Sequence, residues 1–334
     1  MNFTSSKTHV LLALCALFFV VTGCKQNREN KAENEMIVQK ESNENTDSLF
    51  FELSLAQWSL HKAIQSGKLD PLDFAEKASE LGFSGIEYVS TFYSERINEA
   101  EDPEAEMKIV LDSLKSKSEK FNIRNVLIMV DGEGDLADPS EEVRNKAVEN
   151  HKKWVDAAEF LGCHSIRVNT FGTNDPQEWH NAVIDGLTKL SEYAATKKIN
   201  ILVENHGWLS SDITKLMAAI NEVNMENCGT LPDTGNFCTK RKDGQKWGEC
   251  EEHFDPYKGV KLMLPKAEGV SAKSEDFPDA GMEIDYEKMM QIVKDSGYEG
   301  FIGIEYESDK YPEDEGILHL KNLVLKSAEN IANN

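Results

Sequence analysis

The feature that most constrains the fold is an alternation, from residue 52 onward, of short β-branched runs with longer amphipathic stretches. The runs predict strands and the stretches predict helices. Eight runs occur, near residues 53–58, 85–89, 123–130, 165–170, 200–205, 229–233, 269–273 and 301–306. Such alternation is typical of a parallel sheet. No glycine-rich nucleotide fingerprint follows the first run. The pattern therefore favours an α/β fold of the closed (β/α)8 TIM-barrel type over an open doubly wound sheet.

Aspartate–proline pairs mark where several helices are expected to begin. An aspartate can cap a helix, and proline suits the first turn. The pairs are Asp70-Pro71, Asp138-Pro139, Asp175-Pro176 and Asp255-Pro256.

The N-terminal segment has the pattern of a targeting signal. Lys7 precedes an apolar run at 10–21 that is too short to span a bilayer, and the run leads into Val-Thr-Gly-Cys24. These residues resemble a bacterial lipoprotein box, which implies cleavage and lipidation at Cys24. An ordinary secretory signal is the alternative. We expect residues 1–24 to be the signal, 25–48 a flexible polar tether, and 49–334 one catalytic barrel anchored to the cell envelope, in the periplasm or outer membrane.

The net charge limits the classes of binding partner, and the cysteines bear on whether the protein forms a disulfide. The net charge of −23 opposes binding to nucleic acid, which requires a basic face. The same balance, with only eight histidines, argues against an abasic-site endonuclease. An exported protein can form disulfides, and Cys238 and Cys250 flank one loop. Spacing alone leaves a bridge and two free thiols equally open.

Acidic residues stand at the ends of several predicted strands. The tetrapeptide Gly-Ile-Glu-Tyr occurs twice and contributes Glu87 and Glu305, while Glu204 and Asp233 follow two other apolar runs. Alternation along a strand lets each glutamate face the barrel interior while isoleucine and tyrosine face the helices. Ligands of such barrels collect where strands end. We therefore expect Glu204, Asp233 and Glu305 to meet at one mouth, with Lys273 beside them.

This group of side chains suits a divalent cation. Carboxylate oxygens are preferred by Mg²⁺ or Mn²⁺, and an imidazole such as that of His206 also admits Co²⁺ or Zn²⁺. Each acid could instead cap a loop or pair with a lysine. His206 could be a hydrogen-bond donor outside the metal shell, and Lys273 could simply hold an acid in a salt bridge.

Five short motifs together resemble one enzyme family. They are LAQWSLH, VENHG, LPDTGNF, VSAKS and IGIEYE, which lie in this order over roughly residues 50–330. They are similar to motifs of the sugar phosphate isomerase/epimerase family, the xylose-isomerase-like barrels. The resemblance implies one divalent metal held by Glu204, Asp233 and Glu305. Many relatives carry a histidine where this chain has Lys273, which cannot ligate a metal while protonated. Either His206 completes the shell, or Lys273 replaces part of the metal's role.

The expected reaction is isomerisation or epimerisation of a sugar through an enediolate. Glu204 and Glu305 are the candidate base and acid, and Lys273 is the candidate for stabilising the enediolate oxygen. An exported enzyme meets few phosphorylated sugars, so an unphosphorylated or oxidised sugar is expected. The alternatives are a lyase that eliminates from a keto-sugar or keto-glycoside, and a non-catalytic sugar-binding lipoprotein.

Five further residues are expected to contact the sugar. Four of them lie at the ends of predicted strands one and four, and the other belongs to the first Gly-Ile-Glu-Tyr copy, where an indirect role is also open. They are Gln57, Trp58, His61, Asn169 and Glu87.

Overall fold

Eight parallel strands form the core of a computed structural model that describes residues 49–332. They are β1 (Glu52–Ala56), β2 (Gly85–Val89), β3 (Arg124–Val130), β4 (Ser165–Val168), β5 (Asn200–Glu204), β6 (Cys228–Leu231), β9 (Val270–Lys273) and β10 (Phe301–Glu305). Their order is β6-β5-β4-β3-β2-β1-β10-β9. Parallel bridges Thr230–Ala267 and Asp233–Ser271 join the two ends of this order. The predicted (β/α)8 TIM barrel is thereby confirmed.

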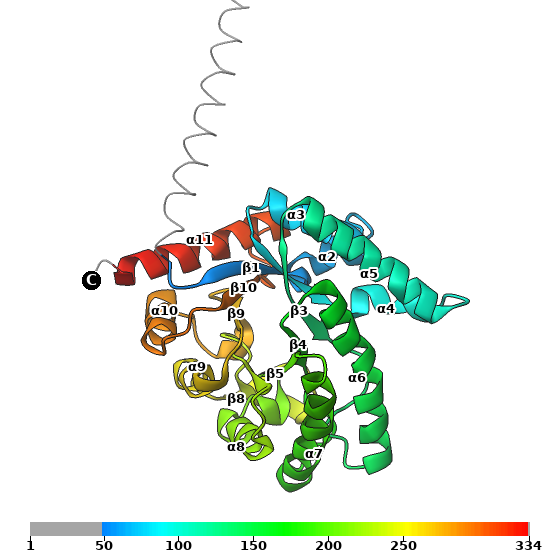
Figure 1. The fold of residues 1–334 in the computed structure, drawn as a ribbon. Coiled ribbons are helices and arrows are strands. Elements are labelled where there is room, and N and C mark those ends of the chain that lie inside the picture. Colours follow the sequence, from blue (N-terminus) through cyan, green and yellow to red (C-terminus); the bar gives the residue numbers. More distant parts are fainter. Residues whose placement is uncertain (1–48, 333–334) are drawn as a thin grey trace, which may run out of the picture. The chain divides into compact units, whose positions relative to one another are not determined.

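Helices surround the strands on the outside of the barrel (Figure 1). They are α2 (His61–Gln65), α3 (Phe74–Glu80), α4 (Thr91–Asn98), α5 (Pro103–Lys120), α6 (Glu141–Leu161), α7 (Pro176–Ala195), α8 (Ile213–Val223), α9 (Pro256–Met263), α10 (Tyr286–Asp295) and α11 (Glu313–Ala332). Within the described part of the chain, no helix is both long enough and apolar enough to cross a membrane. The signal, the tether and Cys24 lie outside the described residues.

Three of the four predicted aspartate caps are present. Asp70, Asp175 and Asp255 each accept a hydrogen bond from a backbone N–H in the first turn that follows. The exception precedes α6, where Ser140 is the cap. Asp138 instead accepts from the N–H of Ser140 and so shapes the turn before the helix.

The barrel interior has an apolar lower part and a polar upper part. Side chains from five strands form an apolar cluster, which comprises Ala56, Val89, Val126, Leu127, Met129, Leu202 and Leu231. Ile86 and Ile304 point outward and are fully buried against the helices. The predicted alternation of faces therefore holds, and the inward positions nearest the strand ends are left for polar groups.

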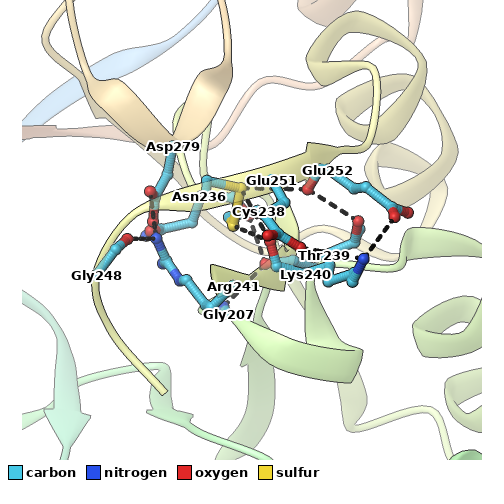
Figure 2. The surroundings of a disulfide bond; sticks show 12 residues. Gly207, Asn236, Cys238, Thr239, Lys240, Arg241, Gly248, Glu251, Glu252 and Asp279 are labelled. Atoms are coloured by element: carbon cyan, nitrogen blue, oxygen red, sulfur yellow. Dashed lines mark hydrogen bonds and ion pairs between the residues drawn. A yellow bond between two sulfur atoms is a disulfide. The ribbon is translucent and has the colours of Figure 1, made fainter. Parts of the chain in front are cut away.

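One loop carries an additional hairpin. Between β6 and α9, the strands β7 (Cys238–Arg241) and β8 (Cys250–His253) pair antiparallel. A disulfide joins Cys238 to Cys250, so the bridge that the sequence left open is formed (Figure 2). Arg241, at the end of β7, also stabilises the hairpin. Its guanidinium pairs with Asp279 and donates to the carbonyl of Gly248 at 2.7 Å. The hairpin is thus fixed at both ends of its loop.

Candidate active site

Three carboxylates from separate strands meet at the upper end of the barrel. Glu204 ends β5, Glu305 ends β10, and Asp233 follows β6. All three are buried, and each offers an oxygen within 4.8 Å of the oxygens of the others. This end is where parallel strands of a barrel present their functional side chains. The central prediction from the sequence, convergence of these acids at one mouth, agrees with the structure.

Lys273 lies in the same cluster and is almost completely buried. Its ammonium nitrogen lies 2.8 Å from Oε1 of Glu305 and 3.4 Å from Oδ2 of Asp233, and it also pairs with Glu307. Burial alone would lower the pKa of Lys273, but the surrounding acids raise it well above its usual value. The lysine is therefore a fixed positive charge inside the acidic cluster.

A second cation, Arg167, reaches the cluster from β4. Its Nε lies 2.9 Å from Oε2 of Glu204, and its Nη1 donates to Oδ1 of Asp131 at 2.8 Å. Burial lowers the pKa of Arg167, while Asp131 and Glu204 raise it more strongly. Arg167 therefore joins a carboxylate of the cluster to one that lies after β3, and it orients both.

Asp233 is positioned by its own loop. Its Oδ1 accepts from the backbone N–H groups of Gly235, at 2.6 Å, and Asn236, at 3.0 Å. Its Oδ2 accepts from the side-chain amide of Asn236 at 2.8 Å. Asn205, next to Glu204, donates to the carbonyl of Asp233 at 2.9 Å. The loops after β5 and β6 thus fix the two acids relative to each other.

The surroundings of the three acids shift their pKa values in different directions. Burial raises the pKa of Asp233, and repulsion from Glu204 and Glu305 adds to this increase against the opposing effect of Lys273. Burial also raises the pKa of Glu204, and Glu305 adds to this increase, although Arg167 and Lys273 oppose it. Burial also disfavours ionised Glu305, but Lys273 and the hydroxyl of Ser271, which donates at 2.7 Å, hold its pKa below the usual value. Glu305 is therefore the acid best kept as a carboxylate.

The donor set fits a divalent metal ion through the three carboxylates. Hard oxygen ligands at this spacing are what Mg²⁺, Mn²⁺ and related ions use. His206 is not in the group: its Nδ1 pairs with Oδ1 of Asn169 at 2.7 Å, and its ring contacts Trp247. Burial lowers the pKa of His206 to about 4. The predicted fourth ligand, His206, therefore lies outside the group formed by the three acids.

A cavity of about 730 Å³ opens above the cluster. Glu305, Arg167 and Asn236 line this cavity, whereas Glu204 and Asp233 are buried and do not line it. Five carboxylates line the cavity against two strong cations: the acids are Asp131, Asp135, Asp279, Glu305 and Glu307, and the cations are Arg167 and Lys246. The lining therefore favours a neutral, hydroxyl-rich ligand over an anionic one.

The predicted sugar contacts divide into two groups. Trp58 and Asn169 line the cavity, and His61 stacks on Trp58 with ring centroids 4.9 Å apart. The placement of Gln57 needs correction. It is fully buried, its amide donates to Tyr93 and to the carbonyl of Pro71, and its carbonyl accepts from the N–H of Val89. Gln57 therefore holds loops together and does not line the cavity.

Glu87 also needs correction, because it lies inside the barrel below the cavity. Its Oε1 accepts from the hydroxyl of Ser54 at 2.5 Å, and its Oε2 has no hydrogen-bond partner. A methyl group at Gly303 would lie 2.4 Å from Oε1 of Glu87. The glycine of the second Gly-Ile-Glu-Tyr copy thus leaves the space that the glutamate of the first copy fills.

Several residues of the site were not singled out from the sequence. Glu307 binds Lys273 and accepts from the indole of Trp58 at 2.8 Å. The sequence pattern could have predicted Glu307 as a site residue, because it follows Glu305 by two residues and alternation puts both on the same face. Arg167 had a signal too, as a charged residue inside an apolar run. Asp131 had the same signal as Asp233, because it directly follows the predicted strand at 123–130.

Known structures share this barrel. A zinc-bound IolI protein matches with a TM-score of 0.63 and 15% identity, over 84% of this chain and 99% of that one. A D-tagatose 3-epimerase-like protein matches with a TM-score of 0.61 and 18% identity, over 85% and 98%. A 3-keto-D-glucoside 4-epimerase from E. coli matches with a TM-score of 0.53 and 13% identity, over 79% and 95%.

At these identities the likeness establishes the fold. No curated protein sequence matches the chain. A family model described as the xylose isomerase-like TIM barrel matches residues 75–326, and the chain belongs to this family.

Proposed function

We propose that the protein is a sugar isomerase or epimerase that removes a proton from the carbon next to a carbonyl group. The observation that carries this proposal is the meeting of Glu204, Asp233 and Glu305 around the buried ammonium of Lys273. Proton abstraction beside a carbonyl requires a base, an acid and a positive group near the oxygen that becomes negative. The cluster contains each of these, and two of the similar structures are sugar epimerases or resemble one.

In this proposal Glu305 is the base at the cavity surface, because Lys273 keeps it ionised. Glu204, held by Arg167 on the other side of the cluster, returns the proton. Lys273 stabilises the enediolate oxygen. A divalent ion held by Glu204, Asp233 and Glu305 would add Lewis-acid stabilisation of the same oxygen.

The substrate proposed is an unphosphorylated or oxidised sugar. A phosphate group would meet the excess of carboxylates that lines the cavity. Hydroxyl groups can instead donate to these acids, and Trp58 offers an aromatic face to a ring.

A lyase acting on a keto-glycoside would begin with the same proton abstraction. The observation that favours it is the cavity volume of about 730 Å³, which leaves space for a departing group beside the sugar ring. Proton NMR in D₂O separates the two reactions: isomerisation exchanges one hydrogen without loss of a group, whereas elimination releases water or an alcohol.

The test screens free and 3-keto sugars with the wild-type protein and with Glu204→Gln and Glu305→Gln, together with metal analysis of wild type and Asp233→Asn. We expect turnover of at least one neutral sugar, lost in both glutamine variants, and less bound metal in Asp233→Asn. Sugar binding that survives both glutamine substitutions, with no turnover by the wild type, would instead identify a sugar-binding lipoprotein.

The proposal also places the enzyme outside the inner membrane, attached through Cys24. The disulfide between Cys238 and Cys250 supports this location, because such bonds persist in oxidising compartments. Metabolic labelling with a fatty acid should mark the wild type in the membrane fraction and leave Cys24→Ala unlabelled. Labelling that persists in Cys24→Ala would contradict the anchor.

A further inference from the structure

The loop between β6 and α9 is much longer than the connections that such barrels need. It runs from residue 232 to 255 and contains its own hairpin, whereas βα loops commonly have about 2–6 residues. Long ordered loops are usually functional. The disulfide and the pairing of Arg241 with Asp279 hold the two ends of the hairpin loop (Figure 2). Nearer the tip, the indole of Trp208 donates to the carbonyl of Gln245 at 3.1 Å.

The fixed tip places two side chains on the wall of the cavity. Lys246 lies with its ammonium 3.3 Å from the centre of the Phe171 ring, and burial lowers its pKa. Trp247 packs edge-on against Phe171 at 6.0 Å and His206 at 5.1 Å, yet 49% of its surface stays exposed. A large aromatic side chain that is held in place and left half uncovered at a cavity is a contact surface for a ligand.

A separate aromatic group lies across the mouth. Trp58 follows β1 and stacks on Phe92 at 5.7 Å. In the strand order, three strands separate β1 from β5 in each direction around the barrel, so Trp58 and the residues after β5 lie on opposite sides. Glu307, which binds Trp58, joins the Trp58 side to the catalytic cluster. On the opposite side, Trp247 contacts His206 after β5, and no hydrogen bond or ion pair joins Trp247 to Glu305 or Lys273 in the described part of the chain.

The cavity is too large for one sugar ring. A pyranose has the bulk of about six waters, roughly 180 Å³. The cavity measures about 730 Å³, within the range of sites that enclose ligands of drug size. One ring next to Glu305 would leave the space between Trp247 and Asp135 open to water.

We propose that Trp247, Lys246 and Phe171 form a second binding subsite for a ring linked to the reacting sugar, so that the substrate is a neutral glycoside with two rings. This inference rests on the proposed function for the identity of the reacting ring. The second ring packs its apolar face on Trp247, and its hydroxyl groups reach Lys246 and the acids after β3. The hairpin then serves substrate selection, because it positions a surface that proton transfer does not require.

The experiment compares ligand pairs that share one ring. Free glucose, galactose and xylose are titrated calorimetrically against their β-phenyl glycosides and β-linked disaccharides. The proteins are wild type, Trp247→Ala, Trp247→Tyr and a matched control, Phe160→Ala, which removes an exposed aromatic ring from α6 outside the cavity lining. Melting temperatures verify that each variant is folded.

We expect at least one two-ring ligand to bind wild type about tenfold more tightly than its single ring, the factor given by roughly 60 Å² of additional apolar burial. Trp247→Ala should lose this gain without weakening single-ring binding, Trp247→Tyr should retain most of it, and Phe160→Ala should behave as wild type. The subsite is overturned if no two-ring ligand binds more tightly, if nothing in the panel binds, or if Trp247→Ala weakens both ligands equally. Tighter two-ring binding without turnover would reject the isomerase but not the subsite.

Discussion

The two Gly-Ile-Glu-Tyr segments have the same sequence but different surroundings. They lie on β2 and β10, which flank β1. Glu87 is sealed inside the barrel with one hydrogen-bond donor, and burial raises its pKa to about 7. Glu305 reaches the cavity, and Lys273 keeps its pKa low despite burial. The difference shows that the partner residues, and not the tetrapeptide, decide whether a buried glutamate is held in its ionised form.

The largest contrast is expected in activity. Glu305→Gln should lower kcat by about 10²–10⁴-fold, the usual contribution of a general base, while Glu87→Gln should change it only a few-fold. Initial rates on the sugar identified in the screen give both values. Equal losses in the two variants would show that the two copies do not differ in role.

The second contrast is in the pH dependence of stability. Between pH 4.5 and about 7, folded Glu87 retains a proton that the unfolded chain has released, so the contribution of Glu87 to stability falls as pH rises. Above pH 7 the cost is constant at about 3 kcal/mol. Glu87→Gln removes this cost. We expect the variant to gain little at pH 5 and about 3 kcal/mol at pH 8, as measured by urea unfolding in EDTA.

A gain that does not change with pH would show that Glu87 is not the titrating group. Glu192→Gln, at an exposed position on α7, is the matched control, and its stability should follow that of the wild type at both pH values.

The glycines give the third contrast. Gly303→Ala places a methyl group against the carboxylate of Glu87 and should cost about 1–3 kcal/mol. The added methyl of Gly85→Ala meets Phe301 at 2.6 Å instead. A double-mutant cycle with Glu87→Ala should therefore relieve Gly303→Ala and not Gly85→Ala. Equal relief of both would contradict the contact between Gly303 and Glu87.

The smallest contrast concerns the tyrosines. Tyr88→Phe leaves Oδ1 of Asn125 without its donor at 2.8 Å and should cost about 1 kcal/mol. Tyr306→Phe releases the N–H of Tyr311, which is partly exposed and can bind water, so a smaller loss is expected. Chemical unfolding of both variants at one pH compares the two. A larger loss for Tyr306→Phe would reverse this order.

The sequence predicted the barrel and the convergence of its acids, because both depend on local periodicity. Each of the eight predicted strands is present, and parallel strands bring their ends to one mouth wherever the loops run. The contacts that decide charge were not predictable in this way. Lys273 could be placed at a strand end, but only the folded chain shows it between Asp233, Glu305 and Glu307.

The same reason explains the errors at Gln57 and Glu87. Both stand at or near strand ends, where a ligand contact is a reasonable expectation. Their partners, Tyr93 and Ser54, belong to other segments of the chain, and sequence spacing gives no information on such pairings.

The fit between Gly303 and Glu87 has an evolutionary consequence. Neither position can change freely while the other stays as it is, because a side chain at 303 removes the space for a carboxylate at 87. Among homologous chains, the two positions should therefore covary. A residue larger than glycine at position 303 should accompany a residue shorter than glutamate at position 87. Such covariation would trace how a barrel of this family acquired an acidic group inside its wall.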